Sequence, residues 1–565
     1  MAAPLFKDET MDPWRWKVDW KERTLRLVQT HPDLVDNPSR EVMIRESIEN
    51  REVIVSANGA LATWTPSEST GRSPKDTYIV RRPESEGNID WDSPNNIPME
   101  PETFDMLMED AVELLAKKKR LYVTDRVLGA DTSYAMPVKT ITDWAATVLF
   151  TDNMFRPMPE EGIEQSVFAD RPFTLLVVPY NKVDRDRYAG RLRKGPGGVT
   201  SNMAVAMDFD RHLGVVIGSA YAGSVKKLMF TVMNYMLPGE GILPLHCSAN
   251  EGPKGDIALL LGLSGTGKTS LSADPRRALL GDDEHGWSDN GIANFEFGCY
   301  AKLINLRPDK EPEIWNAVFH EAPAKEHGAI VENCMMYPWG LFDVDDERYT
   351  PNSRASYPLS FLSNIKPLPV GDHPKTILFL AADANGVLPP VAKLTPEQAM
   401  LWFLMGYTSK LAGTETGIVD PVSTFSRFFG EPFMPRNPDV YASMLGERMR
   451  RYGSQVYLVN TGWSGGSFGV GKRMDIDITR AIVHAALSGD LDDVEYADDP
   501  TFHILVPQSC PGVPAEILNP RNTWEDKEAF DRRAQKLASD FSAHFDKAYG
   551  SKGIDPAVVS QCPGK

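Results

Sequence analysis

A glycine-rich segment near the middle of the chain has the residue types and spacing of a phosphate-binding loop. Residues 262–269 read G-L-S-G-T-G-K-T and follow an apolar run, which is the strand that this motif requires. In such a loop the glycines let backbone N–H groups converge on phosphate oxygens, and the following helix adds its positive end. Lys268 supplies a cation, and Thr269 offers a hydroxyl to Mg²⁺. The motif predicts a nucleotide site rather than a plain glycine-rich turn.

Two carboxylates follow the loop at an unusually short distance. The apolar residues 278–280 predict a strand that ends at Asp282 and Asp283, as a strand that holds a metal ion should. Because Asp283 comes only 15 residues after Lys268, the helix after the loop must be short and end near Asp274-Pro275. An ordinary GTPase or motor ATPase is therefore a poor template. The alternative for the two aspartates is a solvated strand end.

A second group of polar residues lies before the loop. Residues 218–227 bring Tyr221 and the adjacent Lys226 and Lys227 to the start of a predicted helix. His246 follows in an apolar setting. Taken alone, the lysine pair is typical of a solvated helix face, and the histidine is typical of a satisfied core position. These residues gain meaning only in combination with the loop and Asp283.

The elements that must position these residues are of α/β type. Thr395, Pro396 and Gln398 fit a capping box and predict a helix running toward Gly413. Ser224 is a candidate N-cap for another helix. A boundary near 235–245 predicts an N-terminal substrate lobe, 1–240, and a C-terminal nucleotide-binding lobe, 241–565. Periodicity predicts strands over 256–261, 278–280 and 376–380, and further helices over 104–115, 225–236 and 530–545.

Composition excludes several classes of protein. The chain has 565 residues, 42% of them hydrophobic, and a formal net charge of −18, which disfavours general binding to nucleic acid or to acidic membranes. No apolar run approaches the roughly 18 residues that span a bilayer, and the first residues lack a secretory layout. We therefore expect a soluble, cytoplasmic protein. Five dispersed cysteines with no C-x-x-C pair argue against a disulfide framework or a thiolate zinc site.

The order of motifs along the chain resembles that of ATP-dependent phosphoenolpyruvate carboxykinases. The likeness covers about residues 60–545, and it is specific because many separate motifs occur in the family's order. Besides the phosphate loop, the matching segments are Thr70–Asp76, Tyr221–Lys227, His246–Asn250, Gly281–Trp287, Arg354 with Ser356–Pro358, Gly386–Pro390 and Gly471–Arg473.

The resemblance implies a two-lobed α/β fold with a mixed sheet in the N-terminal lobe, the phosphate loop in the C-terminal lobe and the active site in the cleft between them. It implies that oxaloacetate and ATP give phosphoenolpyruvate, ADP and carbon dioxide, a step of gluconeogenesis. It further implies Mn²⁺ held by Lys227, His246 and Asp283, and a Mg²⁺ carried with ATP at Thr269.

The resemblance also assigns roles to other side chains. Arg72 and Tyr221 would contact the substrate, and Arg354 would bridge substrate and γ-phosphate. Lys226, Lys227 and Lys268 complete the catalytic set. The residues expected around the nucleotide and its metals are Lys227, His246, Gly262, Leu263, Ser264, Gly265, Thr266, Gly267, Lys268, Thr269, Ser270, Asp282, Glu311, Arg354, Arg473, Met474 and Thr479.

The metal role implied for Lys227 makes a chemical demand. A lysine ligates a metal only as the neutral amine, and deprotonating an ordinary lysine at pH 7 costs roughly 4 to 5 kcal/mol. A dication, a desolvated cleft and neighbouring cations such as Lys226 and Arg72 would offset that cost. In the implied reaction, loss of carbon dioxide leaves an enolate, whose oxygen attacks the γ-phosphate held by Lys268.

The nucleotide and the class of protein leave alternatives. GTP-using relatives carry a reactive cysteine in the phosphate loop, and residues 264–266 contain none, so the resemblance favours ATP. A P-loop kinase acting on a protein or small hydroxyl acceptor would keep Lys268 and Thr269 but would need no metal site at Lys227 and His246. A nucleotide-gated binding protein would tolerate replacement of Asp283.

Overall fold

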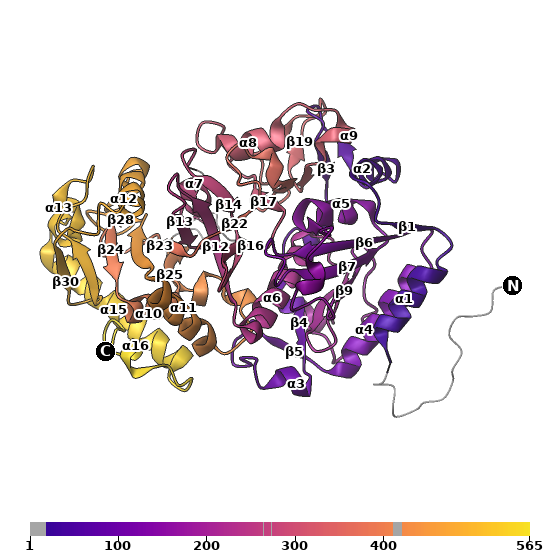
Figure 1. Cartoon of the computed structure of the whole chain (residues 1–565), viewed down its shortest axis with the longest axis horizontal. Helices are drawn as coiled ribbons and strands as arrows, with labels where there is room; N and C mark the ends of the chain where they lie inside the picture. Colours follow the sequence, from indigo (N-terminus) through magenta and orange to yellow (C-terminus); the bar gives the residue numbers. More distant parts are fainter. Residues whose placement is uncertain (1–17, 264, 273, 411–420) are drawn as a thin grey trace.

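The computed structural model describes residues 18–263, 265–272, 274–410 and 421–565, which form a mixed α/β structure built on several sheets (Figure 1). The N-terminal part contains a nine-stranded sheet in the order β1-β6-β7-β9-β11-β10-β4-β5, with β8 paired to β6. It is mixed, because β6 and β7 are antiparallel whereas β7, β9 and β11 are parallel. Its strands are β1 (Leu34–Asp36), β4 (Thr77–Val80), β5 (Ile97–Met99), β6 (Leu121–Leu128), β7 (Met136–Thr142), β8 (Arg156–Pro157), β9 (Phe173–Val178), β10 (Ala204–Asp208) and β11 (Leu213–Ile217).

The C-terminal part contains an eleven-stranded sheet in the order β22-β16-β15-β12-β13-β23-β27-β24-β31-β30, with β14 paired to β12. The fully buried β13 runs parallel to β23 and antiparallel to β12. The strands of this eleven-stranded sheet are β12 (Leu243–Glu251), β13 (Ile257–Leu261), β14 (Ala278–Gly281), β15 (Glu284–Ser288), β16 (Gly291–Asn294), β22 (Val370–Gly371), β23 (Pro374–Ala381), β24 (Val391–Leu394), β27 (Gln455–Asn460), β30 (Tyr496–Asp499) and β31 (Ile504–Pro507).

A smaller five-stranded sheet joins segments that are far apart in sequence. It has the order β17-β21-β18-β3-β2, and β3 lies parallel to β18. Residues near position 60 therefore form one sheet with residues 298–358. Its strands are β2 (Ile54–Val55), β3 (Leu61–Thr63), β17 (Gly298–Lys302), β18 (Ile330–Glu332) and β21 (Arg354–Pro358).

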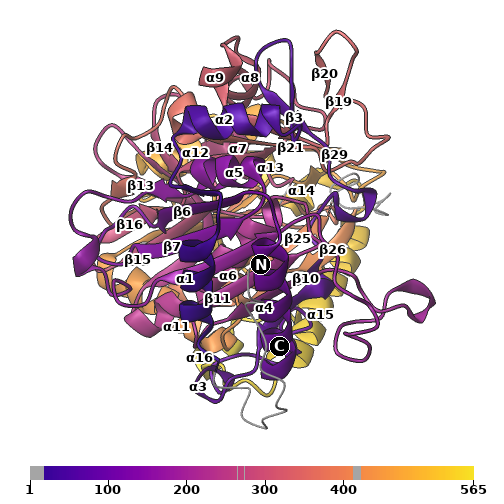
Figure 2. The ribbon, with the colours of Figure 1, turned by 90° about the vertical axis from the view of Figure 1, so that its right-hand side faces the viewer.

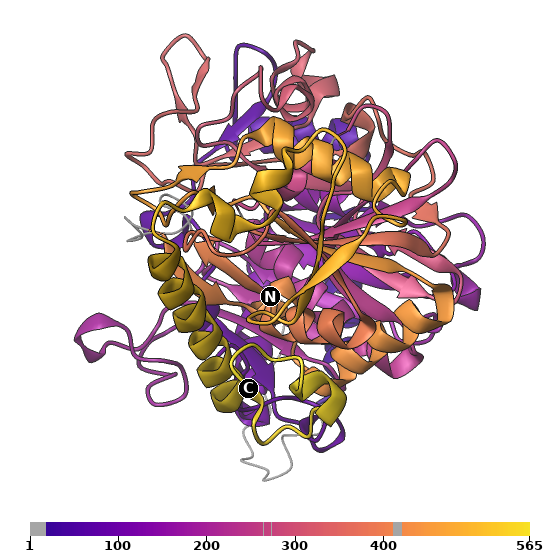
Figure 3. The ribbon, with the colours of Figure 1, turned by 90° about the vertical axis from the view of Figure 1, so that its left-hand side faces the viewer.

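Helices cover the sheets on the outside and also lie between them. Helix α4 lies on the nine-stranded sheet with α1 beside it (Figure 2), and α15 runs along the outer side of the C-terminal part (Figure 3). Helix α6 lies between the two large sheets and contacts β10, β11 and β12. The longer helices are α1 (Trp20–Thr30), α2 (Arg40–Glu49), α4 (Pro101–Ala116), α5 (Ala145–Met154), α6 (Gly223–Met236), α8 (Pro312–Phe319), α10 (Pro396–Met405), α11 (Pro438–Tyr452), α12 (Ile476–Ser488) and α15 (Lys527–Tyr549). The short helix α7 (Lys268–Ser272) follows Gly267.

Most predicted elements are confirmed, and two local predictions are wrong. Helix α10 begins with the expected capping box at Thr395, but it ends at Met405 rather than near Gly413, because Gly406 adopts a left-handed conformation with φ of 53°. Residues 411–420 lie outside the described residues. Helix α6 is preceded by Ala222, so Ser224 is not its N-cap; the Ser224 hydroxyl instead lies 2.8 Å from that of Ser219.

Buried apolar side chains account for the packing of the layers. Phe530, Leu537 and Phe541 on α15 lie in the same cluster as Trp402 of α10, which explains the apolar stripe of the C-terminal helix. Across residues 18–263, 265–272, 274–410 and 421–565, none of the helices has the length and apolar character that a bilayer crossing requires.

Candidate active site

Strand register brings the predicted metal ligands together. In the pairing of β12 with β15, His246 stands opposite Glu284, which places the histidine beside Asp283 at the preceding turn. Lys226 and Lys227 reach the same point from the first two turns of α6. Their ammonium nitrogens lie 2.9 and 2.7 Å from Asp283 Oδ2. The structure therefore assembles the lysine, the histidine and the aspartate from three elements.

Asp283 is the centre of a cluster of cations. Lys226 and Lys227 contact its Oδ2, while Lys268 of the phosphate loop approaches Oδ1 to 3.1 Å. Burial would raise the pKa of the Asp283 carboxyl, but these three ammonium groups outweigh burial and hold that pKa well below its usual range. Asp283 is therefore an anion at neutral pH. The same carboxylate joins the predicted metal ligands Lys227 and His246 to Lys268.

His246 shows that a cation fits this position. Its Nδ1 lies 2.6 Å from the Phe429 carbonyl oxygen, which can only accept a hydrogen bond, so Nδ1 carries the proton of the neutral ring. The lone pair of Nε2 then faces Asp283 Oδ1 at 2.8 Å. Two acceptors at that distance need a proton or a metal ion between them. Because burial and Lys268 lower the pKa of His246 to about 4, a divalent ion suits the site at neutral pH.

Two buried glutamates that sequence reasoning missed lie beside the lysine pair. Glu284 Oε1 lies 2.7 Å from Lys227 Nζ, and Glu296 Oε1 lies 2.9 Å from Lys226 Nζ. Burial lowers the pKa of Lys226, yet the surrounding carboxylates raise it well above its ordinary value, so Lys226 stays charged. Glu284 directly follows Asp283 in the sequence, so it could have been predicted as a site residue. Glu296 offered no such signal, because only the pairing of β15 with β16 brings it near.

Gly262, Gly265 and Gly267 of the predicted phosphate loop stand at backbone positions that exclude or disfavour a larger residue. A side chain at Gly262 would meet Thr266 Oγ1 at 2.5 Å, and Gly265 and Gly267 have φ of 88° and 92°. Helix α7 is short and ends at Ser272, as the spacing to Asp283 predicts. Ser264 lies outside the described residues. Thr269 and Ser270 lie on α7.

A later segment of the chain, residues 461–474, lies against the phosphate loop. Arg473 donates through Nε to the carbonyl oxygen of Thr461 and through Nη2 to that of Gly265, each at 3.1 Å. The Thr461 hydroxyl in turn donates to Thr266 O at 3.1 Å. Arg473 is thus brought to the loop. The neighbouring Met474 donates its N–H to Gly462 O at 2.8 Å.

The remaining residues that were predicted to surround the nucleotide come from different elements of the chain. Thr479 is buried in the first turn of α12, and Glu311 directly precedes α8. Asp282 follows β14, and its carbonyl oxygen accepts a bond of 2.6 Å from the Ser248 hydroxyl. Leu263 packs against the core of the C-terminal part. Their roles toward a nucleotide stay predictions.

The predicted substrate residues fall into two groups. Arg72 and Lys227 line one small pocket with Phe433, whose ring lies 4.6 Å from the Arg72 guanidinium carbon and 4.7 Å from Lys227 Nζ. Tyr221 and Arg354 meet at Tyr300 instead: the Tyr221 ring lies 5.8 Å and the Arg354 guanidinium carbon 5.9 Å from the Tyr300 ring. Phe433 and Tyr300 were not predicted from the sequence.

Comparisons with known proteins agree with the motifs. A family model described as phosphoenolpyruvate carboxykinase matches residues 32–516. A protein of Moorella thermoacetica named phosphoenolpyruvate carboxykinase (ATP) 1 is 49% identical over 89% of this chain and 92% of its own length. Relatives named phosphoenolpyruvate carboxykinase (ATP) from Thermus thermophilus and Rhizobium rhizogenes are each 46% identical; they cover 93% and 92% of this chain and 96% and 93% of their own lengths.

Proposed function

The chain belongs to the phosphoenolpyruvate carboxykinase family, and we therefore propose that it converts oxaloacetate and ATP into phosphoenolpyruvate, ADP and carbon dioxide. The observation that carries the proposal is the Asp283 carboxylate, which contacts Lys227 and His246 on one side and Lys268 on the other. A site for an enolate and a site for a triphosphate would then share one charge. The substrates are small molecules, and the reaction in this direction is a step of gluconeogenesis.

We assign the two halves of the chain to two lobes, 1–240 for the substrate and 241–565 for the nucleotide, with the reaction in the cleft between them. The separate nine- and eleven-stranded sheets support this division. The five-stranded sheet crosses it, because β3 pairs with β18. Movement of one lobe would therefore carry or bend that sheet.

The phosphate loop would bind ATP. Backbone N–H groups of residues 262–269 and the Lys268 ammonium would hold the β- and γ-phosphates, and Thr269 would offer its hydroxyl to the Mg²⁺ that accompanies ATP. Arg473 would support the loop through Gly265, to which it is hydrogen bonded. Met474, Thr479, Glu311 and Arg354 would surround the rest of the nucleotide. The absence of cysteine at 264–266 favours ATP over GTP.

Lys227, His246 and Asp283 would hold Mn²⁺, which when bound supplies Lewis-acid stabilisation of negative charge on the substrate. The amine, imidazole and carboxylate donors suit Mn²⁺ acceptably without thiolates. The carbonyl of Phe429 fixes the His246 ring so that Nε2 is the donor atom. Lys226, which is buried and charged, would face the anions rather than the metal.

The protein side chains would then guide two consecutive bond changes. Arg72 would bind a carboxylate of oxaloacetate through paired N–H groups, with Tyr221 beside it. As the carbon–carbon bond to the leaving carboxylate breaks, its electron pair forms the enolate of pyruvate and carbon dioxide departs. Lys226 and Arg354 would stabilise the developing charge. The enolate oxygen attacks the γ-phosphorus, and ADP leaves with the electrons of the broken P–O bond.

A coupled assay tests this proposal directly. Purified protein would be given oxaloacetate with ATP or GTP, each with and without Mn²⁺, and phosphoenolpyruvate would be measured. We expect product with ATP, a marked gain on adding Mn²⁺ beside Mg²⁺, and little product with GTP. Nucleotide hydrolysis or transfer to another hydroxyl, without phosphoenolpyruvate, would contradict the proposal and favour a P-loop kinase.

A further inference from the structure

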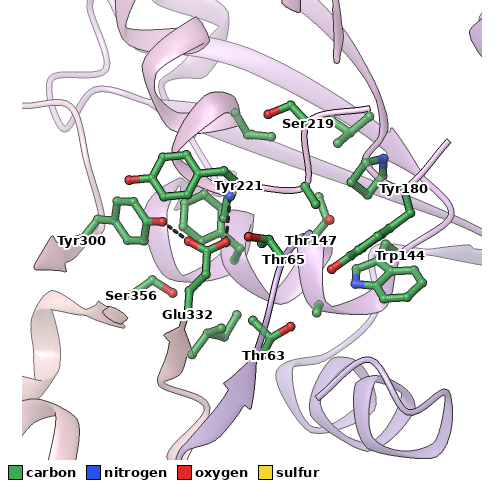
Figure 4. A pocket seen from close by; sticks show the side chains of 18 residues that line it. Thr63, Thr65, Trp144, Thr147, Tyr180, Ser219, Tyr221, Tyr300, Glu332 and Ser356 are labelled. Carbon is green, nitrogen blue, oxygen red and sulfur yellow. Dashed lines mark hydrogen bonds between the residues drawn. The ribbon is translucent and has the colours of Figure 1, made fainter. Parts of the chain in front are cut away.

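A buried carboxyl group behind the substrate residues has no role in the chemistry described so far. Glu332, the last residue of β18, is 3% exposed. Its Oε1 accepts a hydrogen bond of 3.0 Å from the backbone N–H of Ala222, and its Oε2 accepts one from the Tyr300 hydroxyl. Figure 4 shows the Glu332 carboxyl group aimed at the Tyr300 hydroxyl and lying next to Tyr221. One side chain from β18 thus holds two separate elements.

The first element is the start of α6. Its N-cap residue, Ala222, has no side chain that could cap the helix, so Glu332 supplies an acceptor from a distant strand. Ser69 completes this arrangement, because its hydroxyl oxygen accepts the N–H groups of Ala220 and Tyr221 at 2.9 and 3.2 Å. Together they fix the segment that leads into Lys226 and Lys227. A shift of this turn would move both lysines relative to Asp283.

The second element is the Tyr300 ring. It lies against Tyr221 and Arg354, at 5.8 Å from the Tyr221 ring and 5.9 Å from the Arg354 guanidinium carbon. Phe150 packs on the same ring edge-on at 5.4 Å. The hydrogen bond from the Tyr300 hydroxyl to Glu332 fixes the position of this ring. The predicted substrate residues Tyr221 and Arg354 both lie against this ring. We call Tyr300 and Glu332 together the wall of the site.

We propose that Glu332 is a positioning residue for the enolate: its carboxyl group fixes the start of α6 and the Tyr300 ring, and through them Tyr221, Arg354 and the lysine pair. This inference rests on the proposed function. Its chemical consequence concerns a competition. A well-placed enolate oxygen attacks the γ-phosphorus, whereas a loosely held enolate takes a proton from water on carbon and becomes pyruvate.

The charge of Glu332 is expected to matter as well as its position. The ionisable groups that face it are Tyr300 on β17, Arg354 on β21, Tyr221 before α6 and Tyr180 after β9. Burial raises the pKa of Glu332 to about 7 against the opposing hydrogen bonds from Tyr300 and Ala222. The carboxylate accepts from both partners, whereas the protonated form has a proton to donate. Loss of this proton should strengthen both contacts as the pH rises through 7.

The test compares Glu332→Gln and Glu332→Ala with a matched control, Glu52→Gln. Glu52 is also buried, also has a pKa raised by burial to about 7, and also accepts a helix N–H, that of Ala146 in α5, at 2.7 Å. It contacts none of the predicted substrate residues among the bonds described. Each protein would be assayed from pH 6 to 8.5 for phosphoenolpyruvate and pyruvate formed from the same oxaloacetate and ATP.

We expect Glu332→Ala to raise the ratio of pyruvate to phosphoenolpyruvate about fivefold or more and to lower kcat/KM for oxaloacetate roughly 10- to 100-fold, with KM for ATP changed less than about twofold. Glu332→Gln can still accept from Ala222, so its loss should be smaller, but the change of product ratio near pH 7 should disappear. Glu52→Gln should keep both the ratio and its pH dependence.

A wild-type product ratio and pH profile in Glu332→Gln would overturn the inference, and this variant decides the matter if Glu332→Ala fails to fold. Equal changes in Glu52→Gln and Glu332→Gln would also overturn it, because they would reveal a general effect of removing a buried charge. Failure of the proposed function is distinguishable, since the wild-type protein would then form no phosphoenolpyruvate. In that case the binding of oxalate, a planar dianion, to wild type and Glu332→Ala still measures positioning.

Discussion

The cluster around Asp283 and the wall around Glu332 both bury carboxyl groups, yet they treat the negative charge in opposite ways. Three lysines hold the pKa of Asp283 well below its usual range despite burial. At Glu332 burial dominates, and the pKa rises to about 7. Asp283 is thus a permanent anion in a positive surrounding, whereas Glu332 changes its charge near neutral pH.

The difference follows from where the cations lie. Lys226, Lys227 and Lys268 all approach Asp283 within 3.1 Å, whereas the partners of Glu332 are a backbone N–H and a phenol. In a chain of net charge −18, we propose that this local concentration of lysines handles the anionic reactants. The wall shapes the site and carries little fixed charge.

The largest effect is expected from breaking the cluster at Lys227. Lys227→Met removes a predicted metal ligand and one partner of Asp283, so phosphoenolpyruvate formation should fall about 1,000-fold while ATP binding changes less than about twofold. Mn²⁺ titration followed by electron paramagnetic resonance, together with the coupled assay, measures both. The exposed Lys254→Met is the control. Wild-type turnover of Lys227→Met would exclude the metal role.

A second substitution separates the two ends of the cluster. Lys268→Met removes the cation of the phosphate loop, so phosphoenolpyruvate formation should fall roughly 100- to 1,000-fold. Metal-assisted decarboxylation of oxaloacetate to pyruvate should be largely spared, because Lys227 and His246 remain. Pyruvate and phosphoenolpyruvate are measured in parallel. If both activities vanish in a folded protein, the division of labour between the two ends is wrong.

A third substitution tests whether burial raises the pKa of a glutamate, at Glu52, which lies outside the predicted active site. Its folded pKa of about 7 exceeds the value of 4.5 expected when exposed, so the folded protein keeps a proton that the unfolded chain releases between these pH values. Stability from this group is therefore lost as pH rises from about 4.5 to 7. The free energy of unfolding of Glu52→Gln, measured with urea, should therefore rise by about 2 kcal/mol relative to that of the wild type as the pH goes from 5 to 8. A constant difference would refute the raised pKa.

The smallest effect concerns the wall itself. Tyr300→Phe keeps the ring but removes the hydroxyl that donates to Glu332, so kcat/KM for oxaloacetate should fall about fivefold with little change in KM for ATP. Tyr337→Phe removes a comparable tyrosine–aspartate bond at the exposed surface and serves as the control. Identical behaviour of the two variants would show that the Tyr300 hydroxyl does not position substrate residues.

Much of the fold and part of the site could be predicted from local patterns. The strand before Gly262, the short α7 and the helix over 104–115 follow from apolar spacing and from the distance to Asp283. The end of α10 was mispredicted, because Gly406 stops the helix before any signal near Gly413. Ser224 was mispredicted as an N-cap, because its hydroxyl is engaged by Ser219 instead. The lobe division and the ligand roles remain proposals.

The sequence by itself determined which groups are available: a phosphate loop, a lysine pair, a histidine and two aspartates, each recognisable from its own neighbours. Only the tertiary structure decided which of them meet. The pairing of β12 with β15 brings His246 to Asp283, and the strand pairings of the five-stranded sheet bring Glu332 to Tyr300. The physical reason is that backbone patterns act over a few residues, whereas contacts between residues 37 positions apart, such as His246 and Asp283, or 32 apart, such as Tyr300 and Glu332, depend on strand register and burial.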